Sequence, residues 1–172
     1  MPTIRPVKSE CEVAAVAQLA RIIWTHHFTP IIGEAQVEYM LNAIQSSAAI
    51  AEQIGEGVEY YLLDSEKGPM GYFALSHESG SLQLSKIYVL PQKQGEGLGS
   101  FMLSFVEARC RELCKDKLWL TVNRNNATAV RFYKKHGFQV VDETVKSIGE
   151  GFVMDDYIMS KKVARQADST VR

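Results

Sequence analysis

The chain has 172 residues, 46% of them hydrophobic, which is enough for one compact domain with a buried core. Its 19 lysines and arginines nearly balance its 20 aspartates and glutamates, so no broad electrostatic field favours nucleic acid or an anionic membrane as a partner. No stretch approaches the ~20 apolar residues of a membrane span, and the N-terminus lacks the apolar core of a secretion signal. These properties predict a cytoplasmic protein that acts on small molecules.

We expect a single domain over residues 1–163 and a polar, flexible tail over residues 164–172. The three cysteines, Cys11, Cys110 and Cys114, cannot all pair with one another. They are not accompanied by cysteines or histidines at the spacing of metal ligands. We therefore expect reduced thiols and no metal site.

The first 35 residues predict an edge strand followed by a helix. Residues 3–7 read as a strand, and the prolines around it are tolerated only at the edge of a sheet. Ser9 and Glu12 form a capping box, after which apolar residues recur at helical spacing. We expect the helix to end near His27, because Pro30 and the glycine after it interrupt the pattern.

The remainder of the chain alternates helices and strands, joined by segments rich in glycine, serine and asparagine. The expected helices cover residues 36–54, with a break at 46–47, residues 98–113 and residues 126–136. The expected strands cover residues 59–63, 70–76, 84–90, 118–122, 138–143 and 151–160, the first three forming an antiparallel meander. The element order is βααβββαβαββ, which indicates an α/β domain.

The segment from Gln94 to Ser100 lies between a strand and a helix and is rich in glycine. Three glycines at alternate positions, Gly95, Gly97 and Gly99, allow positive φ and let a phosphate approach without meeting a Cβ. The start of the helix adds free N–H groups and the positive end of the helix dipole. The segment is therefore predicted to bind phosphate groups.

Two well-known phosphate motifs do not fit this segment. The dinucleotide fingerprint needs a last glycine where Ser100 stands, and an acidic residue at the end of the next strand, which ends near Arg124. The loop of nucleotide hydrolases needs a Gly-Lys-Ser/Thr sequence, which this chain lacks.

A second segment decides between the remaining interpretations. Residues 126–138 read N-x-x-A-x-x-F-Y-x-x-x-G-F, and they follow a Q-x-x-G-x-G sequence at residues 94–99. In this order the two motifs closely resemble those of the GNAT superfamily of acyl-CoA-dependent N-acetyltransferases. The resemblance covers residues 3–162, and its specific motifs lie between residues 84 and 138.

The resemblance implies a mixed, largely antiparallel sheet that splays near its middle, with flanking helices. It implies acetyl-CoA as acyl donor, with the pyrophosphate on the glycine-rich loop and the pantetheine arm paired with the preceding strand like an added strand. The implied cofactor-binding residues are Ile87, Tyr88, Val89, Gln94, Gly95, Glu96, Gly97, Leu98, Gly99, Ser100, Asn126 and Tyr133.

The resemblance also implies direct attack of the acceptor amine on the thioester in a ternary complex. Tyr133 occupies the position whose hydroxyl lies beside the thioester sulfur, so it is the candidate general acid that protonates the departing thiolate. A backbone N–H near Val89 is the candidate stabiliser of the oxyanion. The alternatives are that Asn126 is only a helix N-cap and that Tyr133 is only a core aromatic residue.

The general base stays open, because the family has no universal residue in this role. Alternation along the last strand places Asp155 and Asp156 on opposite faces, so at most one of them can face the site. The candidates are His26, His27, Glu59, His77, Asp155 and Asp156.

The acceptor is expected to be a small primary amine. The segments 24–30 and 154–159 resemble the GNAT branch that includes bacterial spermidine and spermine acetyltransferases. A polyamine would need carboxylates to hold its ammonium groups. Acidic residues in the helical region, which walls the acceptor pocket in this family, are Glu34, Glu38, Glu52, Glu56 and Glu59, and the alternative is a solvated helix face.

Other classes of function stay open beside this one. The chain could be a non-catalytic acyl-CoA-binding regulator, a nucleotide- or phosphate-binding module, or an acetyltransferase that acts on a protein or peptide amine. A homodimer is also open, since sheet edges mediate self-association in this family.

Overall fold

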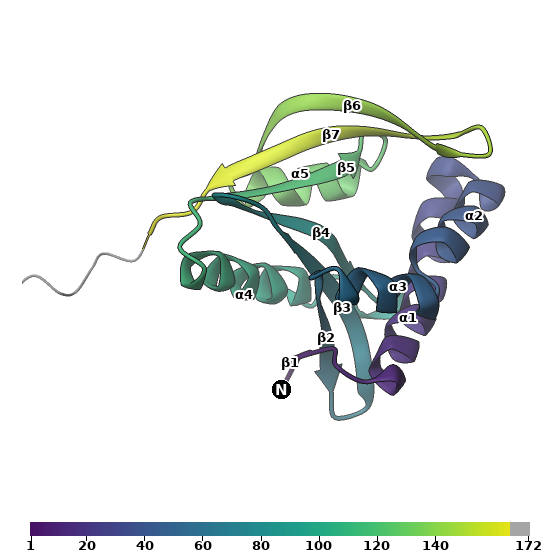
Figure 1. The fold of residues 1–172 in the computed structure, drawn as a ribbon, viewed down its shortest axis with the longest axis horizontal. Helices are drawn as coiled ribbons and strands as arrows, with labels where there is room; N and C mark the ends of the chain where they lie inside the picture. Colours follow the sequence, from purple (N-terminus) through teal and green to yellow (C-terminus); the bar gives the residue numbers. More distant parts are fainter. Residues whose placement is uncertain (166–172) are drawn as a thin grey trace, which may run out of the picture. The chain divides into compact units, whose positions relative to one another are not determined.

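The computed structural model describes residues 1–165 (Figure 1). Unit 1 comprises residues 1–76 and 84–102, and unit 2 comprises residues 77–83 and 103–165, each of them compact. That residues 1–163 form one domain stays a prediction. The expected flexible tail lies outside the described residues, apart from residues 164 and 165.

Three helices follow the first strand in unit 1: α1 (Glu10–Ile32), α2 (Glu34–Ile44) and α3 (Ser47–Gly55). The capping box of α1 and the break between α2 and α3 are confirmed. The predicted end of α1 was wrong, because the helix continues through Pro30 to Ile32, with Gly33 as its C-cap. Proline removes one helical hydrogen bond, but the N–H of Gly33 still closes the last turn on the Thr29 carbonyl at 3.0 Å.

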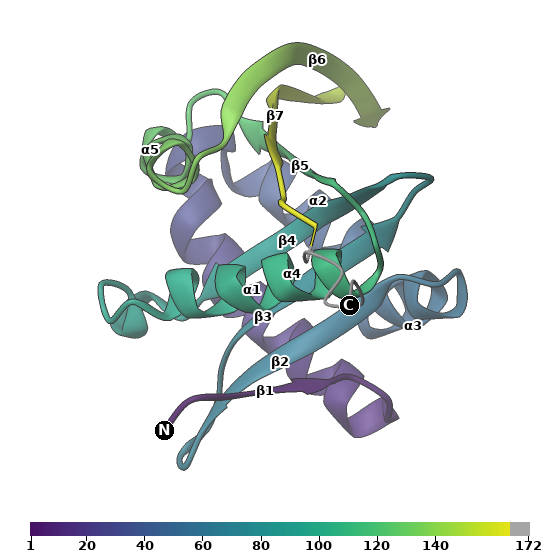
Figure 2. The ribbon, with the colours of Figure 1, turned by 90° about the vertical axis from the view of Figure 1, so that its left-hand side faces the viewer.

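The strands of unit 1 lie side by side in Figure 2. They are β1 (Thr3–Pro6), β2 (Glu59–Ser65), β3 (Gly68–His77) and the C-terminal two thirds of β4 (Ser81–Val89). Antiparallel pairing joins β1 to β2 and β2 to β3, so β1 is the expected edge strand. Side chains of α1 and α3 contact β2 and β4, and the core between them includes Ile23, Leu62 and Tyr72, each at most 1% exposed.

Unit 2 contains most of α4 (Leu98–Glu112), β5 (Lys117–Asn123), α5 (Ala127–Lys135), β6 (Gln139–Gly149) and β7 (Phe152–Lys162). Residues 81–83 of β4 pair with β5 in parallel, and β7 pairs antiparallel with both β5 and β6. Both β6 and β7 are longer than predicted. Irregular register at two places in β6 accounts for the bend of this strand in Figure 2.

The strand order is β1-β2-β3-β4-β5-β7-β6, with antiparallel pairs predominating. The predicted α/β class and mixed sheet are thus confirmed, and the element order differs only by the division of the second helical region and by a short turn of 3-10 helix, η1 (Pro91–Lys93). Within residues 1–165, no helix combines the length and the hydrophobicity needed to cross a membrane.

Candidate functional site

The glycine-rich loop in unit 1 connects β4, through η1, to the start of α4. Gly95 and Gly97 have φ values of 83° and 77°, and a Cβ at either position would meet no atom within 4 Å. The Gly97 carbonyl accepts the first helical hydrogen bond, from the N–H of Phe101 at 3.0 Å. Positive φ was also expected at Gly99, but this residue lies in the first turn of α4. The loop therefore presents an uncovered backbone directly before a 15-residue helix.

The side chains of this loop are mainly exposed. Gln94 and Glu96 are exposed, whereas Leu98 is 8% exposed and anchors the start of α4 in the core. The Glu96 carboxylate lies 3.4 Å from the Lys93 ammonium group. The predicted anion site therefore contains the negative charge of Glu96, which the positive charge of Lys93 partly compensates.

The predicted pantetheine strand, residues 87–89, has its central side chain fixed by aromatic contacts. The ring of Tyr88 lies 5.6 Å from the ring of Trp24, 5.9 Å from that of Phe28 and 5.5 Å from that of Tyr72. Side chains alternate along a strand, so those of Ile87 and Val89 point to the face opposite Tyr88.

Lys86 shares the face of β4 that carries Tyr88, and sequence reasoning missed it. Its Nζ lies 3.5 Å from Oε1 of Gln53 and 5.6 Å from the centre of the Tyr60 ring. Burial lowers the pKa of Lys86 to about 8. Within the described residues its ammonium group has no carboxylate partner. The sequence signal was a lysine two positions from a tyrosine, in a strand that alternates polar and apolar residues up to Lys86.

A buried hydrogen-bond network fixes Gln53 below Lys86. The Tyr72 hydroxyl donates to Gln45 at 2.6 Å, the Gln45 amide donates to the Tyr60 hydroxyl at 3.1 Å, and that hydroxyl donates to Gln53 at 2.6 Å. Burial raises the pKa of Tyr60 to about 12 and that of Tyr72 well above its ordinary value, so both are neutral donors.

In unit 2, Asn126 is the N-cap of α5, with its side-chain oxygen accepting from the N–H of Ala129 at 3.3 Å. Tyr133 lies on the same helix, is 8% exposed, and packs edge-on against Phe132 and Phe138. Its hydroxyl has no hydrogen-bond partner among residues 1–165. Burial raises the pKa of Tyr133, so the phenol keeps its proton at neutral pH.

The structure separates the candidates for the general base. Asp155 accepts from the Arg124 guanidinium at 2.7 Å, whereas Asp156 is 4% exposed and lies opposite Asn123 of β5. His26 and His77 are exposed. Glu59 accepts from the Tyr61 hydroxyl at 2.8 Å, and His27 stacks edge-on against the neighbouring Phe28.

Most of the acidic residues considered for a polyamine lie at the surface. The exposed ones are Glu34, Glu38, Glu52 and Glu56. Glu38 also pairs with Arg21 at 3.2 Å. These four carboxylates therefore form a solvated helix surface rather than a cluster, which matches the alternative interpretation.

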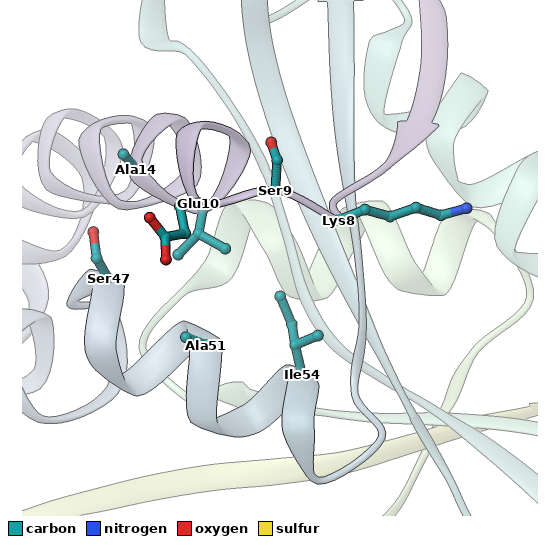
Figure 3. A pocket seen from close by; sticks show the side chains of 8 residues that line it. Lys8, Ser9, Glu10, Ala14, Ser47, Ala51 and Ile54 are labelled. Carbon is teal, nitrogen blue, oxygen red and sulfur yellow. The ribbon is translucent and has the colours of Figure 1, made fainter.

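A hollow of about 450 Å³ lies between the start of α1 and α3 in unit 1 (Figure 3). Ala51 and Ile54 of α3 face it, and the Lys8 side chain extends away from it. At the nearby start of α1, the Ser9 hydroxyl accepts from the N–H of Glu12, and the Glu12 carboxylate accepts from the N–H groups of Lys8 and Ser9. None of the predicted site residues lines this hollow. Residues 1–165 also contain no group of His, Cys, Asp and Glu arranged to hold a metal ion.

Comparison with known proteins identifies the family. A family model for the acetyltransferase (GNAT) domain matches residues 28–159. An uncharacterized N-acetyltransferase of Mycobacterium bovis is 28% identical over 136 residues, which cover 78% of this chain and 86% of that protein. A spermine/spermidine N(1)-acetyltransferase of Bacillus subtilis is 34% identical over 64 residues, 37% of this chain and 42% of that protein.

The fold also matches a solved structure. The PaiA N-acetyltransferase of Thermoplasma acidophilum, solved in complex with coenzyme A, superposes with a TM-score of 0.81 at 22% identity, over 94% of this chain and 99% of that one. The family match spans both sequence motifs and confirms the resemblance on which they were interpreted. The chain belongs to the GNAT acetyltransferase family.

Proposed function

We propose that this protein transfers the acetyl group of acetyl-CoA to a small primary amine by direct attack in a ternary complex. The observation that carries the proposal is the uncovered backbone at Gly95 and Gly97 before α4, in a chain of the GNAT family. A neighbour of the same fold was solved with coenzyme A, which supports an acyl-CoA donor here.

The residues proposed to bind acetyl-CoA supply two kinds of contact. The loop from Gln94 to Ser100 offers backbone N–H groups and the positive end of the α4 dipole to the pyrophosphate. The strand from Ile87 to Val89 offers its backbone N–H and C=O groups to the pantetheine arm, which pairs with it like an added strand. Asn126 combines its capping role with a contact to the cofactor.

The chemistry then needs a protonated group for the leaving thiolate. The amine nitrogen attacks the thioester carbon, and the backbone N–H near Val89 stabilises the oxyanion that forms. As the C–S bond breaks, the Tyr133 hydroxyl gives its proton to the sulfur. Tyr133 is 8% exposed and its hydroxyl has no partner within the described residues, which supports this role because the donor is not engaged elsewhere there.

A polyamine is the first acceptor to test, because a curated relative acts on spermine and spermidine. That relative matches only 64 residues, and four of the acidic residues considered for ammonium binding are exposed. The acceptor class is therefore proposed as small primary amines, with polyamines as its first members.

The test is thiol release from acetyl-CoA across polyamines, amino acids, aminoglycosides and short peptides, with an acceptor-free control. Turnover with a small amine supports the proposal, and turnover only with peptides would move the acceptor to a protein amine. If no member of the panel causes thiol release, and CoA raises Tm whereas ATP and NAD do not, the result would indicate a non-catalytic acyl-CoA-binding regulator.

A further inference from the structure

Asp156 is a buried carboxylate without a partner. Its residue is 4% exposed, and its side chain makes no hydrogen bond or ion pair with the residues that the structure describes. Its neighbour Asp155 is instead paired with Arg124, which also contacts Glu143 of β6 at 3.2 Å. Its oxygens are not among the fully enclosed unpaired atoms of the described residues, so the carboxylate keeps a small contact with solvent. A mostly buried carboxylate without an ion-pair partner is a pattern found at functional sites.

The register of the strands fixes the face to which Asp156 belongs. Residues directly opposite one another in an antiparallel pair share a face, so Asp156 lies on the face of Asn123, and Lys161 lies on the other face with Leu118. The Lys161 ammonium group contacts the Glu107 carboxylate of α4 at 2.5 Å and the His136 carbonyl at the end of α5 at 2.7 Å. Both helices of unit 2 therefore cover the face opposite Asp156.

Tyr133 belongs to the helix-covered face. The centre of its ring lies 5.6 Å from the centre of the Phe138 ring. The Lys161 ammonium group lies over the same Phe138 ring, 5.6 Å from its centre. The candidate acid and the unpartnered carboxylate thus belong to opposite faces of the β5–β7 pair. Asp156 of β7 lies opposite Asn123, the last residue of β5. The Asn123 carbonyl accepts a hydrogen bond from the N–H of Asn126, the N-cap of α5.

We propose that Asp156 is the general base of the acetyl transfer, receiving the acceptor ammonium group and removing its proton before attack. This role rests on the proposed function. The carboxylate takes one proton from the ammonium nitrogen, and the neutral nitrogen forms the bond to the thioester carbon. The C–S bond breaks, and the sulfur takes the Tyr133 proton. After the attack the nitrogen loses a second proton to solvent, and Tyr133 is reprotonated from solvent. Asp156 releases to solvent the proton that it took from the ammonium group.

The surroundings of Asp156 suit a base that works near neutral pH. The residues directly opposite it, Asn123 on β5 and Thr144 on β6, carry no charge. Burial and, to a lesser extent, the charge of Asp155 raise the pKa of Asp156 to about 6. Arg124, the residue after β5, pairs with Glu143 of β6 and with Asp155. A carboxylate with this pKa is ionised at pH 7 and is a better proton acceptor than an ordinary aspartate.

The experiment compares Asp156→Asn with its matched neighbour, Asp155→Asn, using the acceptor found for the wild type. We expect Asp156→Asn to lower kcat at least ~100-fold with unchanged acetyl-CoA affinity, as loss of a general base does. The acid limb of the wild-type kcat/KM profile, with its midpoint near pH 6, should be absent from this variant. Asp155→Asn should keep the limb, shifted to lower pH because the charge of Asp155 is removed, and Asp156→Glu should restore part of the rate.

A second measurement separates this role from a structural one. Above pH 6 the wild type carries a buried charge that Asn lacks, so Asp156→Asn should raise Tm at pH 7.5, whereas loss of a structural contact would lower it. Equal rates for Asp156→Asn and the wild type, or an unchanged acid limb, would overturn the role of Asp156 alone. A wild type that releases no thiol with any amine would overturn the proposed function itself.

Discussion

Gly71 of β3 lies directly against the backbone of Tyr88 in β4. A Cβ on Gly71 would overlap the Tyr88 carbonyl oxygen and lie 3.2 Å from the Cα of Val89. Only glycine allows the two strands this approach, and it occurs at the part of β4 proposed to hold the pantetheine arm. We therefore propose that Gly71 positions this part of β4.

Gly71→Ala should weaken acetyl-CoA binding at least ~10-fold, because backbone atoms, unlike flexible side chains, cannot give way without moving β4. It should also lower the free energy of unfolding by about 1–3 kcal/mol. Calorimetric titration with CoA and urea unfolding measure the two effects. Gly55→Ala is the matched control, since a Cβ there meets no atom within 4 Å and no positive φ is required. Unchanged CoA affinity in Gly71→Ala would remove the positioning role.

Gly97→Val tests the glycine loop itself. The branched side chain would stand on the uncovered backbone and would be strained at a φ of 77°, so CoA affinity should fall by more than tenfold. The control is Gly57→Val, which imposes similar strain at an exposed glycine with a φ of 101° outside the loop. Equal losses of CoA affinity in both variants would show that strain, not the phosphate contact, is responsible.

Glu96→Gln should strengthen CoA binding by a few fold at low salt. The change removes a carboxylate from the proposed anion site and releases Lys93 from its ion pair. Because both side chains are exposed, the gain should shrink as ionic strength rises. Glu112→Gln removes an equivalent pair, formed with Arg109 three positions earlier, and should leave CoA affinity unchanged. Weaker binding in Glu96→Gln would place the pyrophosphate elsewhere.

Tyr133→Phe should lower kcat at least ~100-fold while CoA affinity and Tm stay close to wild type. The hydroxyl has no partner in residues 1–165, so its removal breaks no hydrogen bond there. Pre-steady-state thiol release and CoA titration separate turnover from binding. A rate equal to that of the wild type would exclude the general-acid role.

Lys86→Met should increase stability in a way that depends on pH. The folded-state pKa of about 8 lies below the ordinary 10.5, so below pH 8 the folded protein bears the cost of a buried cation, up to about 3 kcal/mol. As pH rises from 8 to 10.5, Lys86 of the folded wild type loses its proton and the cost of the buried charge disappears. The gain from methionine should therefore be largest at pH 7 and small at pH 10.5, as measured by urea unfolding.

The control for this effect is Lys67→Met, at an exposed turn position, which should stay within about 0.5 kcal/mol of the wild type at every pH. A Lys86→Met variant that is less stable than the wild type at pH 7 would mean that the contacts with Gln53 and Tyr60 outweigh the cost of the charge.

The sequence by itself determined the family, the fold class and the order of the main elements. Local signals sufficed for these: the capping box at Ser9, the positive φ at Gly95 and Gly97, and the N-cap at Asn126 all depend on residues within a few positions of one another. Roles assigned to the loop and to Tyr133 came from the two ordered motifs, and they stay proposals.

Only the tertiary structure decided which side chains are buried without partners. Pro30 stayed helical although local preference opposed it, with nearby Ile23 and Trp24 of the same helix buried in the core. Asp155 and Asp156 are identical in chemistry and adjacent in sequence, yet one pairs with Arg124 and the other is buried alone. Burial and charge pairing depend on residues distant in the chain, such as Gln53 below Lys86, and local patterns do not encode them.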